Sequence, residues 1–227
     1  MSDSSTLLRS DFNLREVVDT RVLPEVGSPS PGVTRRMIER IGDEVARATS
    51  IVRYAPGSNF AEHRHELGEE FLVLAGVFAD EYGLYPAGTY VRNPPGSSHS
   101  PRTDEGCLLF VKLRQMALAD QTRVVVDTRA AAWRQGLVPG LQVLPLGGYQ
   151  NESTALVRWA PGTVFQPHTH FGGEEILVLE GVFEDEYGRY PAGSWMRSPH
   201  GSRHAPFSRE GALIWVKVGH LPIAAES

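Results

Sequence analysis

The two halves of the chain repeat each other, and this repeat constrains the fold more than any other feature of the sequence. Residues 51–113 and 156–218 share 36 identical residues over 63 aligned positions, without a gap. Self-similarity at one fixed spacing indicates a tandem duplication. A unit of about 100 residues is long enough to bury a hydrophobic core of its own.

The repeat also extends toward the N-terminus of each copy, with a small change in spacing. The tetrapeptide VDTR at residues 18–21 recurs at residues 126–129. The short connecting segment MALADQT, residues 116–122, separates the two copies. We therefore predict two domains, at residues 1–115 and 116–227.

Secondary structure is predicted from short apolar runs that end at glycine or proline. FLVLAGVF at residues 71–78 and ILVLEGVF at residues 176–183 are typical of strands. The segment at residues 32–52 allows a helix by its spacing, but its second copy contains Pro145 and Gly147, which would break a helix interior. We predict an all-β fold, with a sandwich or small barrel in each half and almost no helix.

Composition and charge argue against several classes of function. A net charge of −5 offers no general attraction for phosphate groups, so no nucleic-acid partner is expected. No apolar run approaches the roughly 20 residues of a membrane-spanning helix, and the first residues lack the pattern of a secretory signal. We expect a cytoplasmic protein with no membrane partner. The single Cys107 excludes internal disulfides, and its apolar setting predicts a buried strand thiol.

Six of the eight histidines form two triplets that superpose under the repeat. His63 and His65 would point to the same face of a strand, about 6.5–7 Å apart along the chain. His99 and a carboxylate would complete four ligands, and spacing alone leaves Glu69 and Glu70 as alternatives for that carboxylate. The sequence thus predicts two divalent metal ions per chain, and the second set is His168, His170, Glu174 and His204.

These residues match the two sequence motifs of the cupin superfamily. The first motif, G(X)5HXH(X)3,4E(X)6G, is matched by Gly57, His63, His65, Glu69 and Gly76, and again by Gly162, His168, His170, Glu174 and Gly181. The second motif, G(X)5PXG(X)2H, is matched by Gly88, Pro94, Gly96 and His99, and again by Gly193, Pro199, Gly201 and His204. The asparagine that ends the second motif is replaced by Thr103 and Ser208. The chain therefore resembles a bicupin, which implies two tandem RmlC-like jelly-roll barrels.

Among cupins, the chain resembles the cupin-like domain of the zinc-binding anti-sigma factor ChrR, through phrases such as GEEFLVLAGVFADEYG and YPAGTYVRNPPGSSHSP. That resemblance implies zinc at both ligand sets and favours Glu69 over Glu70. Fe(II), Mn and Ni also accept three imidazoles and a carboxylate. ChrR-like anti-sigma factors hold their sigma factor with a separate helical domain. Here the residues before His63 are already assigned to strands by the repeat, so a sigma factor is not an expected partner.

Four further residues are candidates for the wall of a ligand pocket. Arg92 and Arg197 precede the third histidine of each set, and Tyr90 and Trp195 lie two residues before these arginines. A place in the core is the competing interpretation for the aromatic residues. The acidic pair Asp80-Glu81 is interpreted as part of a hairpin turn, and no catalytic residue is assigned.

Two hypotheses about function follow, and the identity of the metal separates them. The resemblance favours a zinc-binding, ChrR-like sensor or regulatory protein. The alternative is an Fe(II)-dependent dioxygenase that cleaves diketones or hydroxyaryl ketones, because some ChrR-like cupins are similar to such enzymes. An isomerase or a sugar-binding cupin is a weaker third interpretation. The enzyme hypothesis predicts a small-molecule ligand in the barrel. The sequence does not decide whether the chain forms a homo-oligomer.

Overall fold

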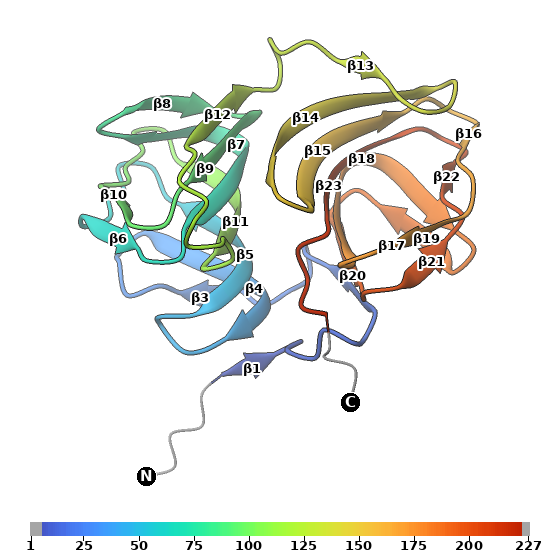
Figure 1. The fold of residues 1–227 in the computed structure, drawn as a ribbon. Helices are drawn as coiled ribbons and strands as arrows, with labels where there is room; N and C mark the ends of the chain where they lie inside the picture. The colour runs from blue at the N-terminus through green and yellow to red at the C-terminus, as the bar shows by residue number, and fades with distance from the viewer. Residues whose placement is uncertain (1–5, 224–227) are drawn as a thin grey trace. The chain divides into compact units, whose positions relative to one another are not determined.

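The computed structural model describes residues 6–223, and within that range every regular element is a β-strand (Figure 1). The same range contains no helix of the length and apolar character needed to cross a membrane. Two compact units divide the chain: unit 1 comprises the residues up to Ser10 together with Val22–Ala130, and unit 2 comprises Asp11–Arg21 together with the residues from Ala131 onward. The predicted all-β class is confirmed.

Unit 1 contains β1 (Leu7–Leu8), β3 (Val26–Gly27), β4 (Val33–Ile41), β5 (Arg47–Tyr54), β6 (His63–His65), β7 (Glu69–Asp80), β8 (Gly83–Pro86), β9 (Thr89–Asn93), β10 (Ser97–His99), β11 (Cys107–Leu113) and β12 (Val124–Asp127). Its main sheet has the order β1-β4-β5-β11-β7-β9-β12, with β3 beside β4 and β8 beside β7. Strands β6 and β10 form a separate two-stranded sheet that carries the first histidine triplet.

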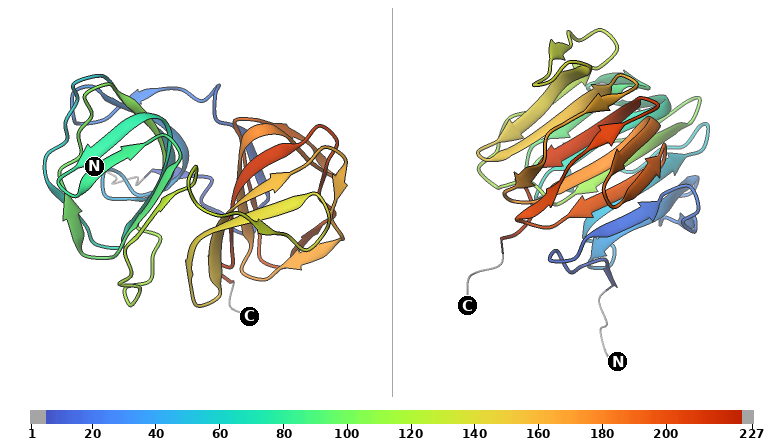
Figure 2. Two further views of the ribbon diagram at one scale, coloured as in Figure 1. Left: turned by 90° about the horizontal axis from the view of Figure 1, so that it is seen from above. Right: turned by 90° about the vertical axis from the view of Figure 1, so that its right-hand side faces the viewer.

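Unit 2 contains β2 (Glu16–Asp19), β13 (Arg134–Gln135), β14 (Leu141–Tyr149), β15 (Glu152–Trp159), β16 (Thr163–Val164), β17 (His168–His170), β18 (Glu174–Asp185), β19 (Gly188–Pro191), β20 (Ser194–Ser198), β21 (Ser202–His204), β22 (Phe207–Ser208) and β23 (Ala212–Val218). Its main sheet has the order β13-β14-β15-β23-β18-β20-β2, and β17 pairs with β21. The strands of each unit curl around an interior of their own (Figure 2), as expected for a jelly-roll barrel.

The compact units do not coincide with the sequence repeats, because one short strand of each repeat lies in the other unit. Strand β2 precedes the first barrel in the chain, yet it pairs with β20 of unit 2 through Val18 and Trp195. Strand β12 follows the first barrel and pairs with β9 of unit 1 through Val126 and Tyr90. Repeat boundaries at 1–115 and 116–227 therefore describe the two sequence copies, and the structure exchanges their leading strands.

The hydrophobic core of each unit comes from one face of its main sheet. In β7, Phe71 and Val73 face the core cluster of unit 1, together with Leu109 and Val111 of β11. Cys107 lies in the same cluster and is buried, as predicted for a strand thiol, and burial raises its pKa to about 11. Burial of these side chains removes apolar surface from water, which is the main favourable contribution to the folding of each barrel.

The segment whose periodicity allowed a helix is a strand in both copies. Val33–Ile41 forms β4, and its counterpart forms β14 with a register shift between Pro145 and Gly147. A proline has no N–H group to donate a hydrogen bond to the neighbouring strand, and the β-bulge at this point accommodates that interruption of the pairing. The second copy therefore predicts the structure of the first correctly.

The glycine that ends the first cupin motif is required by close backbone packing. Gly76 has a φ of 71°, and a Cβ at this position would lie 2.0 Å from the carbonyl oxygen of Gly106. Gly181 repeats this arrangement, with a φ of 68° and the carbonyl of Gly211 at the same distance. Only glycine fits both the backbone conformation and the available space.

Candidate metal centres

The first four predicted ligands converge in unit 1, and we call this group centre 1 (His63, His65, Glu69 and His99). Strands β6 and β10 place His63 directly opposite His99 in the ladder. The Nε2 atoms of His65 and His99 lie 3.0 Å apart, and Glu69 Oε2 lies 3.4 Å from each of them. Ligand atoms of the three histidines all lie within 4.8 Å of one another, so they could hold a metal ion together.

The second four predicted ligands form the equivalent group in unit 2, which we call centre 2 (His168, His170, Glu174 and His204). His168 lies opposite His204 in the ladder between β17 and β21. The Nε2 atoms of His170 and His204 are 3.0 Å apart, and Glu174 Oε2 lies 3.5 and 3.6 Å from them. Here all four residues offer ligand atoms within 4.8 Å of one another.

Backbone carbonyls orient the first histidine of each centre. His63 Nδ1 lies 3.0 Å from the carbonyl oxygen of Ala61, and His168 Nδ1 lies 3.0 Å from that of Gln166. A carbonyl can only accept a hydrogen bond, so Nδ1 carries the proton in both rings. Nε2 is then left with its lone pair available for a metal, which is a common arrangement for ligating histidines.

An aspartate contacts the third histidine of each centre. Asp80 Oδ2 lies 3.2 Å from His99 Nδ1, and Asp185 Oδ2 lies 3.5 Å from His204 Nδ1. The other carboxylate oxygen of Asp80 accepts the backbone N–H groups of Tyr82 and Gly83, which confirms its predicted place in a hairpin turn. The turn interpretation missed the contact with histidine, although both copies retain the phrase DEYG.

Burial and neighbouring charge give the histidines of each centre different pKa values. Burial lowers the pKa of His65, and burial together with His204 and His168 lowers that of His170 to about 3. Burial also disfavours the charged form of His99, but the hydrogen bond to Asp80 and the negative charges of Glu69, Asp80 and Glu81 together outweigh it, so the pKa of His99 is raised. Burial thus favours the neutral form of His65 and His170, which is the form that binds a metal.

The two ligand carboxylates differ in pKa. Burial raises the pKa of both, but at Glu69 the neighbouring His65 and His99 and the side-chain amide of Asn93 outweigh burial, so the pKa of Glu69 is lowered. At Glu174 burial dominates and raises the pKa to about 7. Asn93 Nδ2 donates to Glu69 Oε2 at 3.2 Å, whereas Ser198 lies in register with Glu174.

A divalent metal ion fits this donor set. Glu174 Oε2 is buried and has no hydrogen-bond partner within residues 6–223. A buried carboxylate oxygen without a partner is costly, and a bound cation would satisfy it. Ligand atoms 3.0–3.6 Å apart suit metal–ligand bonds of about 2.0–2.2 Å, and a set of imidazole nitrogens with one carboxylate suits several transition metals.

A pocket of about 180 Å³ opens beside centre 2. His168, Glu174 and His204 form its polar side. The rest of the wall is apolar and consists of Leu137, Leu141, Val143, Val157, Trp159, Phe165, Phe183, Pro206, Ile214 and Val216. A small molecule in this pocket would meet apolar walls on most sides and the metal ligands on one.

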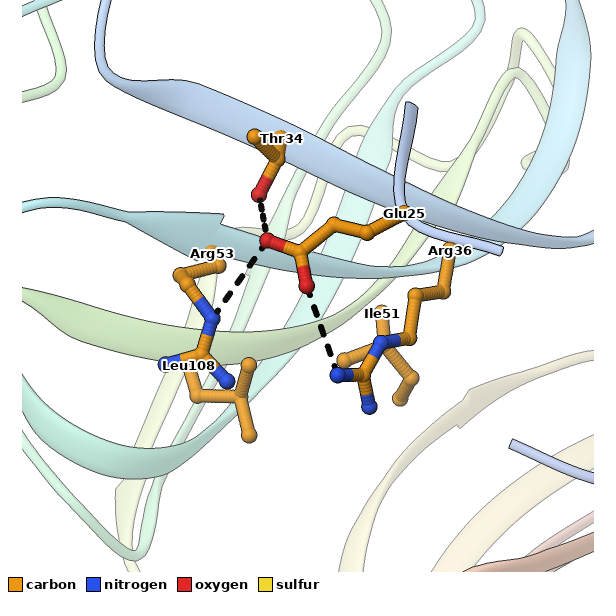
Figure 3. Close-up of a pocket in the computed structure, with 6 residues that line it drawn as sticks. All are labelled: Glu25, Thr34, Arg36, Ile51, Arg53 and Leu108. Atoms are coloured by element: carbon orange, nitrogen blue, oxygen red, sulfur yellow. Dashed lines mark hydrogen bonds and ion pairs between the residues drawn. The ribbon is translucent and has the colours of Figure 1, made fainter. Parts of the chain in front are cut away.

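A shallow depression on unit 1 offers no comparable site. Glu25 occupies it and accepts a hydrogen bond from Thr34, and its carboxylate pairs with Arg36 at 3.3 Å and with Arg53 at 3.7 Å (Figure 3). The hydrogen bond from Thr34, together with the two arginines, lowers the pKa of Glu25. The side chains fill the depression with ion pairs of their own.

The structure places the four candidate pocket residues on the opposite face of each sheet from the histidines. In the ladder between β7 and β9, Glu69 pairs with Asn93 and Glu70 pairs with Arg92, so Arg92 and Tyr90 point away from the Glu69 face. Arg92 Nη2 lies 2.6 Å from Asp120 Oδ2.

Trp195 and Arg197 follow the same alternation in unit 2. The indole of Trp195 donates to Glu175 at 2.8 Å, and Arg197 donates to the carbonyl of Asp11 at 2.8 Å. Neither side chain lines the pocket beside centre 2. Both side chains are fully buried. For Trp195 this agrees with the competing interpretation, which placed the aromatic residues in the core.

Comparisons with known proteins agree with the motifs. The family model described as "ChrR Cupin-like domain" matches residues 13–117 and again residues 121–222. Over 70 residues the chain is 39% identical to the anti-sigma-E factor ChrR of Cereibacter sphaeroides, and this match covers 30% of the chain and 32% of that protein. The chain therefore spans about a third of the length of this relative.

Two solved structures share the two-barrel fold at low sequence identity. A "putative dioxygenase" from Nostoc punctiforme has a TM-score of 0.76 and 16% identity, with 93% of this chain and 85% of that chain covered. A "Putative Glyoxylate Induced Protein" from Pseudomonas aeruginosa has a TM-score of 0.75 and 15% identity, with 100% of this chain and 96% of that chain covered. At such identities the likeness shows the fold alone. Because the family model matches both repeats, the chain belongs to the ChrR cupin-like family and carries two copies of its domain.

Proposed function

We propose that the chain binds two divalent metal ions, one at centre 1 and one at centre 2, and that centre 2 acts on a small apolar molecule. The convergence of three imidazoles and one carboxylate in each unit supports the first part. The apolar pocket beside His168, Glu174 and His204 carries the second part, because a purely structural ion needs no such space.

The pocket favours a compact ligand with an apolar body and one oxygen-bearing end. A cavity of about 150 Å³ lined by aliphatic and aromatic side chains can hold a benzene ring, and this pocket is slightly larger, at about 180 Å³. The rings of Trp159 and Phe165 would contact the apolar body and exclude water from it. Small diketones and hydroxyaryl ketones have this shape.

The reaction that we propose is oxidative cleavage of a carbon–carbon bond by molecular oxygen. In such a dioxygenase reaction both oxygen atoms enter the products, so no further reductant is required. A bound Fe(II) ion would supply the oxygen chemistry and polarise the ketone. Glu174, His168 and His204 would hold the ion on the polar side of the pocket and thereby orient the ketone end of the ligand toward it.

The second candidate is a zinc-binding regulatory protein of ChrR type. Its support is the 39% identity to an anti-sigma-E factor over 70 residues. In this case four protein ligands would nearly close a zinc shell. Loss or rearrangement of those ligands under oxidation would be the signal.

Metal content and oxygen uptake separate the two candidates. We expect close to two metal ions per chain as isolated, one per chain in H65A and in H170A, and none in the double variant. Protein reconstituted with Fe(II) under anaerobic conditions should consume oxygen with members of a panel of diketones and hydroxyaryl ketones. H170A should abolish uptake, and H65A, the matched variant of centre 1, should retain it. Bound zinc with no uptake across the panel would contradict the dioxygenase and favour the regulatory protein.

A further inference from the structure

Two arginines occupy equivalent places in the exchanged segments. Arg15 begins the sequence REVVDTR at residues 15–21, and Arg123 begins RVVVDTR at residues 123–129. Each segment forms the strand that the other repeat's barrel receives, β2 in unit 2 and β12 in unit 1. The exchange therefore brings an arginine from one sequence copy to the metal centre built by the other.

In unit 2, Arg15 reaches centre 2 through a tyrosine and an aspartate. Arg15 Nη2 donates to Tyr190 Oη at 2.6 Å and lies 3.2 Å from Asp185 Oδ2. Tyr190 Oη donates to Asp185 Oδ1 at 2.7 Å, and Asp185 Oδ2 contacts the ligand His204. The guanidinium also lies 5.1 Å from the ring centre of Tyr187, a cation–π contact that helps to hold it in place.

In unit 1, Arg123 repeats this arrangement with two differences: it also contacts Asn93, and it reaches Asp80 only through Tyr85. Arg123 Nη2 donates to Tyr85 Oη at 2.8 Å, Tyr85 Oη donates to Asp80 Oδ1 at 2.9 Å, and Asp80 contacts the ligand His99. Arg123 Nε also donates to the side-chain oxygen of Asn93, at 3.3 Å.

Asn93 in turn donates to the ligand Glu69. Arg123 thus reaches two predicted ligands of centre 1, Glu69 through Asn93 and His99 through Tyr85 and Asp80. The structure describes no direct ion pair between Arg123 and Asp80, so Tyr85 is the link between them.

The arginine compensates a charge that the barrel interior disfavours. Asp80 and Asp185 are almost fully buried. A buried carboxylate requires a cation or several hydrogen-bond donors, and the histidine it contacts must remain available to a metal. In both units the tyrosine donates to Oδ1 of the aspartate and Oδ2 faces histidine Nδ1, and in unit 2 Arg15 contacts that same Oδ2. An aspartate held in this way fixes the histidine ring with Nε2 toward the centre.

We propose that Arg15 and Arg123 are positioning residues, and that each sets the metal affinity of the centre built by the other repeat through a tyrosine–aspartate–histidine chain. Arg15 acts on centre 2 and Arg123 acts on centre 1. This inference rests on the proposed metal binding but not on the proposed dioxygenase reaction. It explains why both copies retain the arginine together with DEYG and YP.

Single-centre variants provide the test, because each centre serves as the control for the other. H65A leaves centre 2 alone for measurement, and H170A leaves centre 1 alone. The zinc dissociation constant is measured by competition with a chromophoric chelator, and the visible spectrum of bound Co(II) reports the ligand geometry. We expect R15Q to weaken zinc binding at centre 2 by about 10-fold, since loss of a residue that orients a metal ligand weakens binding about 10–100-fold. The bands of bound Co(II) should also shift.

The matched measurements make the result specific. R15Q should leave centre 1 unchanged, and R123Q should weaken centre 1 but not centre 2. R15K keeps the charge and should recover part of the affinity. R21Q, which removes an exposed arginine paired with Asp19 on the same segment, should change neither centre.

Two tyrosine variants keep the test decisive if an arginine variant fails to fold. Y85F cuts the described link between Arg123 and Asp80, whereas Y190F leaves the direct pair between Arg15 and Asp185. Y85F should therefore weaken centre 1 more than Y190F weakens centre 2. Unchanged zinc affinity and Co(II) spectra in folded R15Q and R123Q would overturn the inference alone. Absence of metal binding in both single-centre parents would overturn the proposed metal function, and the inference with it.

Discussion

The side-chain amide of Asn93 donates a 3.2 Å hydrogen bond to Glu69 Oε2, and among residues 6–223 the corresponding oxygen of Glu174 at centre 2 has no hydrogen-bond donor. Ser198 holds the corresponding ladder position there, opposite Glu174. The pKa of Glu69 is consequently lowered, while burial raises the pKa of Glu174 to about 7. Two centres with the same ligand residues therefore differ in how readily their carboxylate gives up its proton.

Acidification should release metal from centre 2 before centre 1. A metal ion binds the ionised carboxylate, so protons compete with it below the pKa of that group. Glu174 begins to hold its proton near pH 7, and Glu69 does so only at a lower pH. Zinc affinity measured between pH 5.5 and 7.5 should fall more steeply in H65A, which keeps centre 2, than in H170A, which keeps centre 1.

The reciprocal exchange of Asn93 and Ser198 provides the control. S198N should supply Glu174 with a donor and bring the pH profile of centre 2 closer to that of centre 1, and N93S should do the reverse. Identical profiles for the two centres in the parent protein would contradict this prediction.

Metal-free protein should gain stability at neutral pH when Glu174 is replaced by glutamine. The pKa of Glu174 is about 7 in the folded state, against 4.5 as the ordinary value. Between these values the folded state keeps a proton that the unfolded state releases, so the contribution of Glu174 to stability is present below pH 4.5 and is lost as pH rises toward 7. The difference corresponds to up to about 3 kcal/mol.

Melting temperatures of chelator-treated protein would measure this effect. The difference between E174Q and the parent should grow from pH 5 to pH 7 and level off above it. E69Q should show no such gain, because the pKa of Glu69 is lowered rather than raised. A constant difference across the pH range would rule out Glu174 as its source.

A charge at Val143 should close the pocket of unit 2 to apolar ligands. Val143 lines that pocket and pairs with Val157 in the ladder, and unit 1 has Arg35 at the equivalent position opposite Val52. V143R would fill space and place a guanidinium among apolar side chains, so KM for the best ketone substrate should rise at least about 10-fold. Metal content should not change.

V143L is the matched variant, since it keeps the wall apolar and should leave KM within about threefold of the parent, a difference of less than about 1 kcal/mol. An unchanged KM in V143R would place the substrate elsewhere.

The strand exchange predicts which unit a substitution in the N-terminal segment will destabilise. Val18 in β2 is 8% exposed and lies opposite Trp195 of unit 2. V18D would bury an unpaired carboxylate and should destabilise unit 2 by about 2–4 kcal/mol. All four tryptophans lie in unit 2, at Trp133, Trp159, Trp195 and Trp215, so their fluorescence reports on its unfolding.

V126D is the counterpart in β12, and it should destabilise unit 1. The tryptophan-monitored midpoint in urea should therefore shift more in V18D than in V126D. The opposite order would mean that each leading strand belongs to its own repeat.

Much of the fold was predictable because the two repeats constrain each other. A helix at residues 32–52 is compatible with the first copy alone, and Pro145 in the second copy removes that option. The exchange of β2 and β12 was not predictable in the same way. The two segments have nearly the same sequence, so each fits either sheet edge equally well, and only the path of the chain decides which edge it meets.

The metal ligands were predictable because strand alternation and the cupin motif fix them together. The two-residue spacing of His63 and His65 places both on one face, and the motif selects Glu69. The sequence did not predict which face of the sheet Arg92 occupies, because close to a loop the alternation of side chains depends on a strand register that cannot be derived from the sequence. The contact of Asp80 with His99 was missed since turn residues are assigned by local pattern, and this contact spans 19 positions.

The exchanged strands also determine what half of this protein would be. Residues 1–115 alone would carry β2, which fits a sheet edge of this kind, and would lack β12, which covers its own edge. Such a half would have one strand too many and one sheet edge without a partner strand. Two copies could each place β2 on the free edge of the other, which would give an isologous dimer. Covalent linkage of two such copies would then have turned that symmetric association into one polypeptide whose two candidate metal centres were free to diverge.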